Sequence, residues 1–237
     1  MKKLFWGLFF LITVNFAFAQ GKEYHCYYIQ EKIEIDGQPL EKFWQNVKPV
    51  YFISNTEGEA CATTFFKAAW DDKYLYFYIW MEDDDIRCTM TERDAHLWHE
   101  EVVEIFIDAD CNPKTYYEFE WNALNTLLDL YVLNPGYSRD KITQWWDWNC
   151  LGIKSETYVE GTIQNSNDID KGWGIEIAIP FDQIESAPNI PPQSGDVWRV
   201  DLTRREGSEN AGDLKKSSWL PPSCHFPLSY GDFIFKK

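Results

Sequence analysis

Acidic, amide and aromatic side chains gather on one side of two neighbouring strand-like runs. In the run 103–107, Val103, Ile105 and Ile107 point one way and Glu104 points the other, at the period of a strand. The run 116–122 sets its aromatic residues at 117, 119 and 121 opposite a polar set in the same way. A short turn-like link joins the two runs, so we expect them to pair antiparallel. Hydrogen-bond acceptors beside an indole are the groups that a sugar ring needs. The residues concerned are Trp98, Glu104, Glu118, Glu120 and Asn122.

Two later runs add polar residues to this face if all the strands share one sheet. They contribute Glu176, and then Arg199, Asp201 and Thr203 at alternate positions. Carboxylates bind vicinal hydroxyls through charge-assisted hydrogen bonds, and indoles stack on the C–H face of a pyranose. An arginine–carboxylate network on a solvated sheet face accounts for the same residues. From the residues alone, both interpretations stay open.

The elements that must position these residues are short strands separated by turns. The runs 63–70 and 73–81 predict a hairpin, and the second is apolar throughout, as in a strand buried on both faces. Helical pattern is confined to short pieces such as 43–46 and 181–186. Further expected strands are 33–37, 127–133, 153–159, 173–179, 197–205 and 233–235. Roughly ten strands of this kind predict an all-β fold, an antiparallel β-sandwich or jelly roll with short helical turns.

Residues 1–19 have the features of a signal peptide. A basic start, an apolar run at 4–18 and the small-residue sequence Ala17-Phe18-Ala19 predict cleavage before Gln20. Residues 20–237 then form a single domain, secreted or otherwise extracytoplasmic, and no later segment is expected to span a membrane. Loss of two lysines changes the formal charge from −16 to −18. Such a surface disfavours nucleic acid and acidic polysaccharides, so a carbohydrate ligand is expected to be neutral.

Six cysteines lie in the exported part of the chain. They allow fifteen pairings, and the sequence does not choose between them. An extracytoplasmic location favours some disulfides. A chain of this length can also hold its core without them, so buried thiols are the alternative.

The longest irregular stretch, 134–152, carries three tryptophans at 145, 146 and 148. Indoles in a polar loop are costly to leave in water without a purpose. They either plug one end of the sandwich or bind a ligand.

A series of motifs runs in order through nearly the whole mature chain. The motifs are Ile35-Asp36-Gly37 with Phe43-Trp44, Trp70-Asp71-Asp72-Lys73-Tyr74-Leu75-Tyr76, Trp98 with Val103-Glu104-Ile105-Phe106-Ile107-Asp108, Gly172-Trp173 with Glu176-Ile177-Ala178-Ile179-Pro180, Trp198-Arg199, Ser218-Trp219 and Tyr230-Gly231-Asp232. Taken together, the sequence resembles a family 9 carbohydrate-binding module. The resemblance implies a β-sandwich that binds a saccharide or polysaccharide and has no catalytic residues. It also implies a role in polysaccharide catabolism beside glycoside hydrolases that act in trans.

The resemblance implies roles for individual residues. In this family a tryptophan before the Val-Glu-Ile-Phe-Ile-Asp strand stacks on the sugar, and Trp98 is similar to it. The glutamate of that strand and an asparagine ending the next one match Glu104 and Asn122. The usual arginine and glutamine positions hold Glu120 and Asp201 instead, and a second stacking tryptophan near the C-terminus is replaced by Phe226 or His225. The expected ligand-binding residues are therefore Trp98, Glu104, Glu120, Asn122, Glu176, Asp201 and Phe226.

Some modules of this family hold structural calcium, which the resemblance implies as a cofactor here. Asp108 and Asp110 offer hard oxygen ligands, but Pro113 stands where an EF-hand has glycine. An ordinary solvated turn is the alternative.

Two other functions compete with saccharide binding. A glycoside hydrolase would use two of the four glutamates Glu104, Glu118, Glu120 and Glu176 as acid and as nucleophile or base. A haem-binding relative of the fold would use Met81, Met90 or a histidine as axial ligand.

Overall fold

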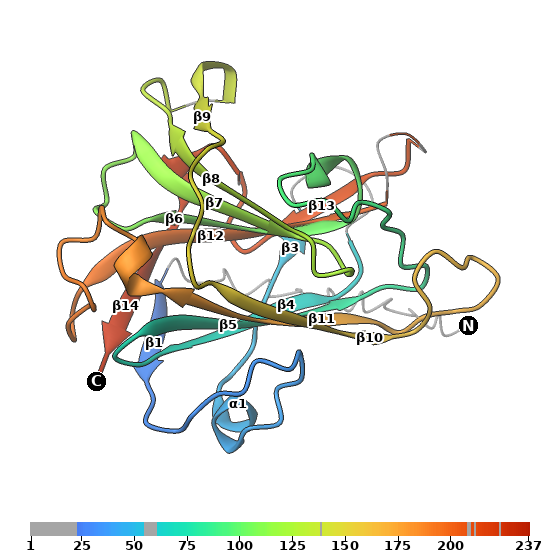
Figure 1. Cartoon of the computed structure of the whole chain (residues 1–237), viewed down its shortest axis with the longest axis horizontal. Helices are drawn as coiled ribbons and strands as arrows, with labels where there is room; N and C mark the ends of the chain where they lie inside the picture. The colour runs from blue at the N-terminus through green and yellow to red at the C-terminus, as the bar shows by residue number, and fades with distance from the viewer. Residues whose placement is uncertain (1–22, 55–60, 138, 208–209, 211, 223) are drawn as a thin grey trace, which may run out of the picture.

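The computed structural model describes residues 23–54, 61–137, 139–207, 210, 212–222 and 224–237. The expected signal peptide, 1–19, lies outside the described residues. Among those residues, no helix has the length and apolar character needed to span a membrane. The described strands form one hydrogen-bonded sheet that curls into two facing layers (Figure 1).

The strands follow the order β10-β11-β5-β4-β1-β14-β12-β6-β7-β8-β9. The lower layer of Figure 1 contains β1 (Glu23–Tyr28), β4 (Thr64–Trp70), β5 (Tyr74–Glu82), β10 (Lys154–Glu160) and β11 (Gly172–Pro180), with β2 (Val50–Tyr51) paired to β4. The upper layer contains β6 (Val102–Asp108), β7 (Thr115–Trp121), β8 (Leu127–Leu133), β9 (Thr143–Trp145) and β12 (Val197–Glu206), with β13 (Lys215–Ser218) between β12 and β3 (Ile53–Ser54). Strand β14 (Gly231–Lys236) connects the layers.

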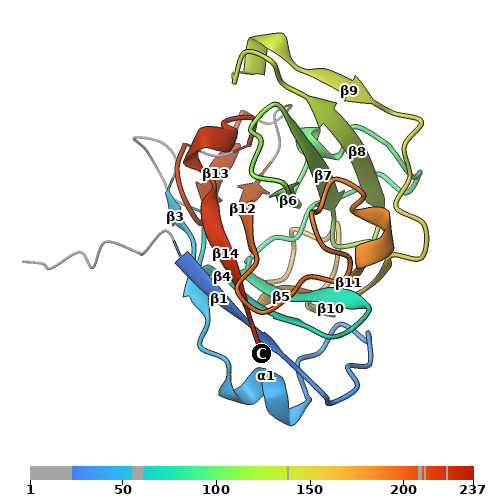
Figure 2. The same cartoon turned by 90° about the vertical axis from the view of Figure 1, so that its left-hand side faces the viewer.

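Strand β1 determines how the layers are joined. It runs parallel to both β4 and β14, whereas the other pairs are antiparallel. Figure 2 shows β1 and β14 side by side where the sheet turns from one layer into the other.

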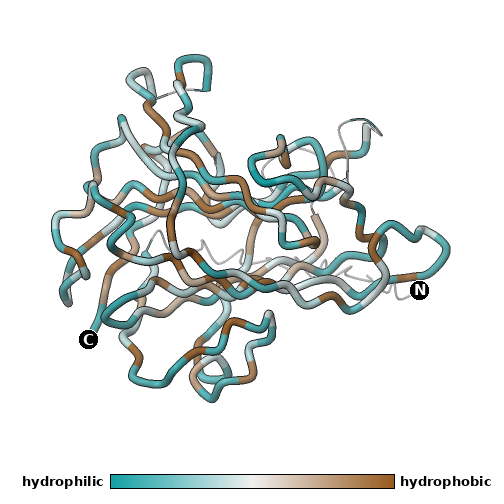
Figure 3. The backbone as a smooth tube through the Cα atoms, viewed as in Figure 1, coloured by the Kyte–Doolittle hydropathy of each residue, from teal (hydrophilic) through white to brown (hydrophobic). Residues whose placement is uncertain are grey.

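The main core fills the space between the layers. Alternate residues of each strand point inward, so Phe77 and Ile79 of β5 meet Ile105 of β6 and Leu202 of β12, all fully buried. Burying each such side chain contributes about 1.5–3 kcal/mol, which makes this interior the main source of stability. Figure 3 shows hydrophilic residues gathered in the loops beyond the strand ends.

Short helices cover or link the strands. The helix α1 (Lys42–Asn46) packs Trp44 against Tyr76 and Tyr78 on the outer face of the lower layer. Strand β5 is thus buried on both faces, as its continuous apolar sequence predicts. The 3₁₀ turns are η1 (Leu97–His99), η2 (Arg139–Lys141), η3 (Phe181–Gln183) and η4 (Pro227–Ser229).

The β-sandwich prediction is confirmed, and so is the hairpin of β4 and β5. The expected strand at 33–37 is wrong, because this segment has no strand pairing and the carboxylate of Glu176 accepts the N–H groups of Asp36 and Gly37 instead. Gly37 has a φ of +84°, and a Cβ there would lie 2.7 Å from the carbonyl carbon of Thr157. The structure also adds β1, β2, β3, β9 and β13 to the expected set.

All six cysteines lie in the described part, and no disulfide joins any pair of them. Cys26, Cys88 and Cys150 are buried. Three of the six cysteines therefore correspond to the buried-thiol alternative, whereas Cys111 is exposed.

Candidate functional site

A small cavity of about 150 Å³ opens on the outer face of the upper layer. Its wall combines one aromatic, three carboxyl groups, two guanidinium groups and several neutral polar side chains. The lining residues are Trp98, Glu104, Glu118, Glu120, Arg139, Ile142, Gln144, Arg205, Cys224 and His225.

Strand register brings the three carboxyl groups together. Glu104 of β6 lies directly opposite Glu120 of β7 and opposite Thr203 of β12. Glu118 is two residues along β7 and faces the same side. Like charges directly opposite each other destabilise a sheet, so this arrangement requires either compensating cations or protonated acids. Arg205 supplies a cation, and the pKa values of Glu118 and Glu120 are raised.

Glu104 is held as a carboxylate by its partners. Its Oε1 accepts a 2.9 Å hydrogen bond from Nε of Arg205, and its Oε2 accepts a 2.5 Å bond from the hydroxyl of Thr203. Burial alone would raise the pKa of Glu104, but the charge of Arg205 and the Thr203 hydroxyl bring it below its usual value. The cavity therefore contains one ionised carboxylate paired to one buried guanidinium.

Glu118 and Glu120 behave in the opposite way. Burial, and then the negative charge of Glu104, raise the pKa of Glu118 to about 8 and that of Glu120 well above its ordinary value. Both residues are almost fully buried, at 3% and 1% exposure, and each has an Oε2 atom without a hydrogen-bond partner. Near neutral pH these two groups are mainly protonated carboxylic acids, which donate as well as accept hydrogen bonds.

His225 closes another side of the cavity as a neutral ring. Burial lowers its pKa to about 4, and its Nδ1 lies 2.7 Å from the hydroxyl oxygen of Tyr116. The adjacent Phe226 is 40% exposed and does not line the cavity. Of the two residues expected to replace the second aromatic, the structure places His225, not Phe226, at the cavity.

Trp98 belongs to an aromatic group at the mouth. Its ring stacks on His96, with centroids 4.5 Å apart and planes at 17°, and lies 6.1 Å from the ring of Trp146. Its carbonyl oxygen accepts a 3.1 Å hydrogen bond from Nη1 of Arg205, which also binds Glu104. The aromatic group and the carboxylate are therefore fixed by the same side chain.

The sequence left open whether the tryptophans of the 134–152 segment plug the sandwich or bind a ligand, and it did not point to Gln144. Gln144 lines the cavity, and Trp146 packs on Trp98. The alternation 144, 146 was readable from the sequence, but nothing local marked 143–145 as the edge strand that places them here.

Besides Phe226, three expected site residues lie outside the cavity, namely Asn122, Asp201 and Glu176. Asn122 is buried at the β7–β8 turn, where its Nδ2 donates to the carbonyl of Met90 and its Oδ1 accepts from the backbone of Leu124 and Thr126. Asp201 is also buried, and its Oδ1 accepts the N–H of Leu220. Both face the same side of the sheet as the cavity but do not line it.

The expectation that Glu176 shares a face with Glu104 is wrong, because β11 belongs to the opposite layer. Its carboxylate accepts hydrogen bonds from Nε1 of Trp44 and from the backbone N–H groups of Asp36 and Gly37. Burial raises its pKa to about 7. The structure thus gives Glu176 a role in holding the 36–44 segment against the lower layer.

The turn after β6 contains the two aspartates expected to bind calcium. Oδ1 of Asp108 accepts the N–H of Asn112, and its Oδ2 is buried. Burial, and then a hydrogen bond with Asp110, raise the pKa of Asp108 to about 7. Two carboxylates fall short of the six to eight oxygens that calcium takes, and the described residues contain no group of three or more acidic, His or Cys side chains placed for a metal. Calcium at this turn stays a prediction.

Met81 and Met90 were the candidate haem ligands. Met81 is fully buried in the core between the layers, which leaves its sulfur without access to a cofactor. Met90 lies beside the β7–β8 turn. Its carbonyl oxygen accepts hydrogen bonds from the side chains of Asn122 and Thr126. Neither methionine lines the cavity.

Comparison with known proteins gives a consistent result. Residues 35–223 match the model of the family described as "Carbohydrate family 9 binding domain-like". The chain is 26% identical over 189 residues to endo-1,4-beta-xylanase A of Thermoanaerobacterium saccharolyticum, and 32% identical over 189 residues to exoglucanase XynX of Acetivibrio thermocellus. Each match covers 80% of this chain but only 14% and 15% of the respective relatives, so the chain corresponds to a small part of those proteins.

Among solved structures, the chain is similar to a family 9 carbohydrate-binding module from Caldicellulosiruptor kristjanssonii in complex with cellotriose. The TM-score is 0.63 at 16% identity, over 90% of this chain and 93% of the module. The same module in complex with glucose gives a TM-score of 0.61, also at 16% identity, over 90% of this chain and 95% of the other. At this identity the likeness establishes a shared fold.

Proposed function

Since the chain belongs to the carbohydrate family 9 binding domain-like family, we propose that it binds a neutral saccharide in the Glu104 cavity and catalyses no reaction. One observation carries this proposal. The cavity joins an aromatic wall at Trp98 to an ionised carboxylate and to two carboxyl groups, each with a buried Oε2 that has no hydrogen-bond partner.

Sugar hydroxyls match this mixture of groups. Each hydroxyl donates one hydrogen bond and accepts others. Buried polar atoms without a partner are costly, so Oε2 of Glu118 and Oε2 of Glu120 gain a partner when a hydroxyl enters. Protonated Glu118 and Glu120 can also donate to a hydroxyl oxygen, which an ionised carboxylate cannot do.

The charge balance favours a neutral ligand. Glu104 and Arg205 compensate each other, and the chain as a whole carries a formal charge of −16. An acidic sugar would add negative charge to a protein that is already strongly acidic. The related module was solved with cellotriose, and the curated relatives are named as a xylanase and an exoglucanase. Neutral cello- and xylo-oligosaccharides are therefore the ligands that we expect.

The geometry of the carboxyl groups supports binding over hydrolysis. A retaining glycosidase needs a free carboxylate as nucleophile, with the sugar between it and the acid. Both oxygens of Glu104 are already engaged by Arg205 and Thr203. Glu118 and Glu120 have raised pKa values, so no unengaged ionised partner stands opposite them among the three. We infer that any degradation is carried out by glycoside hydrolases in trans, after export directed by residues 1–19.

Titration calorimetry on the mature chain tests the ligand class. Cellotriose or xylotriose should give saturable binding, whereas trigalacturonate should give none. A lack of heat with every neutral trisaccharide would refute the proposed saccharide binding. Tight binding of trigalacturonate would refute the argument that the charge of the protein favours a neutral ligand.

A further inference from the structure

The side chains of the tryptophans at 145, 146 and 148 lie on two different faces of the upper layer. In β9, Gln144 pairs with Val132 and Trp145 pairs with Tyr131. Successive strand residues point to opposite faces, so Gln144 and the residue after Trp145 face the Glu104 cavity, while Trp145 faces the other way. Figure 2 shows β9 beside β8 at the outer edge of the upper layer.

The face that receives Trp145 carries a row of aromatic rings. Tyr131, its partner in register, lies 5.1 Å from Tyr117, which in turn lies 5.0 Å from Trp148. Trp148 also contacts Phe119 and packs against the core. Tyr117 and Trp148 are held by these ring contacts. Trp145, by contrast, is 60% exposed.

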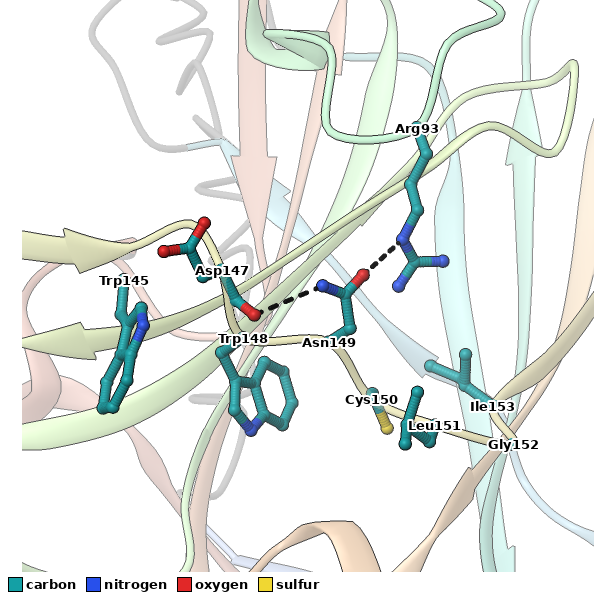
Figure 4. A pocket seen from close by; sticks show the side chains of 9 residues that line it. All are labelled: Arg93, Trp145, Asp147, Trp148, Asn149, Cys150, Leu151, Gly152 and Ile153. Carbon is teal, nitrogen blue, oxygen red and sulfur yellow. Dashed lines mark hydrogen bonds between the residues drawn. The ribbon is translucent and has the colours of Figure 1, made fainter.

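A second, larger cavity of about 770 Å³ lies along this segment and is separate from the Glu104 cavity. Figure 4 shows Trp145 and Trp148 projecting from the same side of the chain, with the Asn149 amide directed toward Arg93. The volume falls within the range of about 300–1,000 Å³ typical of small-molecule sites.

Hydrogen bonds to a buried carboxylate and between neighbouring side chains hold the polar wall of this cavity in place. Nη2 of Arg93 donates a 2.6 Å hydrogen bond to Asp129, which is fully buried and also accepts the N–H of Cys150. Nε of Arg93 donates a 2.8 Å bond to Oδ1 of Asn149. The guanidinium and the amide are thus oriented before any ligand arrives, which reduces the entropy lost on binding.

We propose that this cavity is a second saccharide-binding site, in which a sugar ring stacks on Trp145 and Arg93 and Asn149 donate hydrogen bonds to its hydroxyls. The charge of Arg93 is balanced by Asp129, so a neutral polyol fits better than an anion. The ligand class rests on the proposed function of the Glu104 cavity, but the site itself rests on different residues.

Two sites on one segment make the module bivalent toward a polysaccharide. Trp145 and Trp146 are consecutive residues on opposite faces, so two sugar chains, or two stretches of one chain, can bind at the same edge. Simultaneous binding raises the apparent affinity for an insoluble polymer far more than for a trisaccharide.

The test uses the mature chain with insoluble cellulose and soluble cellohexaose and xylohexaose. Trp145→Ala should weaken adsorption to cellulose about five- to tenfold, the loss expected for one stacked ring plus lost bivalency. The matched control is Tyr27→Ala, which removes a 53% exposed aromatic from β1 and should leave adsorption unchanged. Equal adsorption by the Trp145→Ala variant and the wild type would overturn the second site.

The indole N–H signals in a two-dimensional NMR spectrum separate the two sites. The Trp145 signal, assigned by its absence in Trp145→Ala, should shift with a hexaose in the wild type and also in Trp98→Ala. If only the Trp98 signal shifts with both hexaoses, the second site is refuted and the proposed function stands. If only the Trp145 signal shifts, the second site stands and the Glu104 cavity loses its assigned role. If neither signal shifts, the second site is refuted.

Discussion

The buried acid Glu118 should make the protein less stable as the pH rises. Its pKa is about 8 in the folded state against an ordinary value of 4.5. The folded state therefore binds the proton more tightly than the unfolded state, and the free energy of unfolding falls as the pH rises from about 4.5 to about 8. For this one carboxyl group the fall reaches about 4 kcal/mol at pH 7.5, and local relaxation with entry of water reduces it, so we expect at least about 2 kcal/mol.

Glu118→Gln isolates this effect because the amide is neutral at every pH and has the same shape as the protonated acid. Relative to the wild type, the variant should be about equally stable at pH 4.5 and more stable, by about 2 kcal/mol or more, at pH 7.5. Glu104, Glu120, Arg139, Arg205 and His225 face the same cavity and are unchanged in this comparison. Urea unfolding of the mature chain at both pH values measures the difference, with the exposed Glu92→Gln as control. A stability difference between variant and wild type that is the same at the two pH values would refute the reasoning.

Three further predictions follow from the same contacts. Glu104→Gln removes the counter-charge of buried Arg205 and should cost about 3 kcal/mol in urea unfolding at pH 5.5, with a smaller loss at pH 8 where Glu118 can ionise. No loss at either pH would mean that the pair is not coupled. Glu176→Gln replaces one of the two acceptor oxygens by an N–H₂ group, which then faces at least one of the three N–H donors. The variant should be destabilised by about 1–3 kcal/mol, measured by thermal unfolding, while cellotriose binding is retained. Incubation with xylan or cellulose should release no reducing ends, and turnover that disappears in Glu120→Gln would favour a hydrolase instead.

The fold could be predicted from the sequence, and so could the part of the site that β6 and β7 supply. Alternation in β6 and β7 correctly separated Ile105 and Phe119, which enter the core, from Glu104 and Glu120, which face the cavity. It could not assign Glu176 to a layer, because the period of a strand shows which residues share a face of that strand and not which strands share a layer. The family resemblance pointed to Asn122, but it could not show that backbone groups at the β7–β8 turn already occupy its amide.

Other elements of the site depend on long-range pairing that no local pattern specifies. Arg205 continues the alternation of Arg199, Asp201 and Thr203 in the expected strand 197–205 but was not among the expected site residues. The period does not show that it binds both Glu104 and the carbonyl of Trp98. Trp146 reaches Trp98 only because β9 adds to the edge of β8. The raised pKa values of Glu118 and Glu120 likewise result from burial and from Glu104, which are properties of the assembled sheet.

Calorimetric titration of the mature chain with cellotriose, for the wild type and Trp98→Ala, tests the central claim most directly. Trp98 is partly exposed at the mouth of the cavity, so its removal should leave the melting temperature within a few degrees of the wild type. The account predicts saturable binding by the wild type and affinity at least about tenfold weaker in the variant. Equal affinity in the two proteins, with both folded, would contradict the assignment of the Glu104 cavity as the saccharide-binding site.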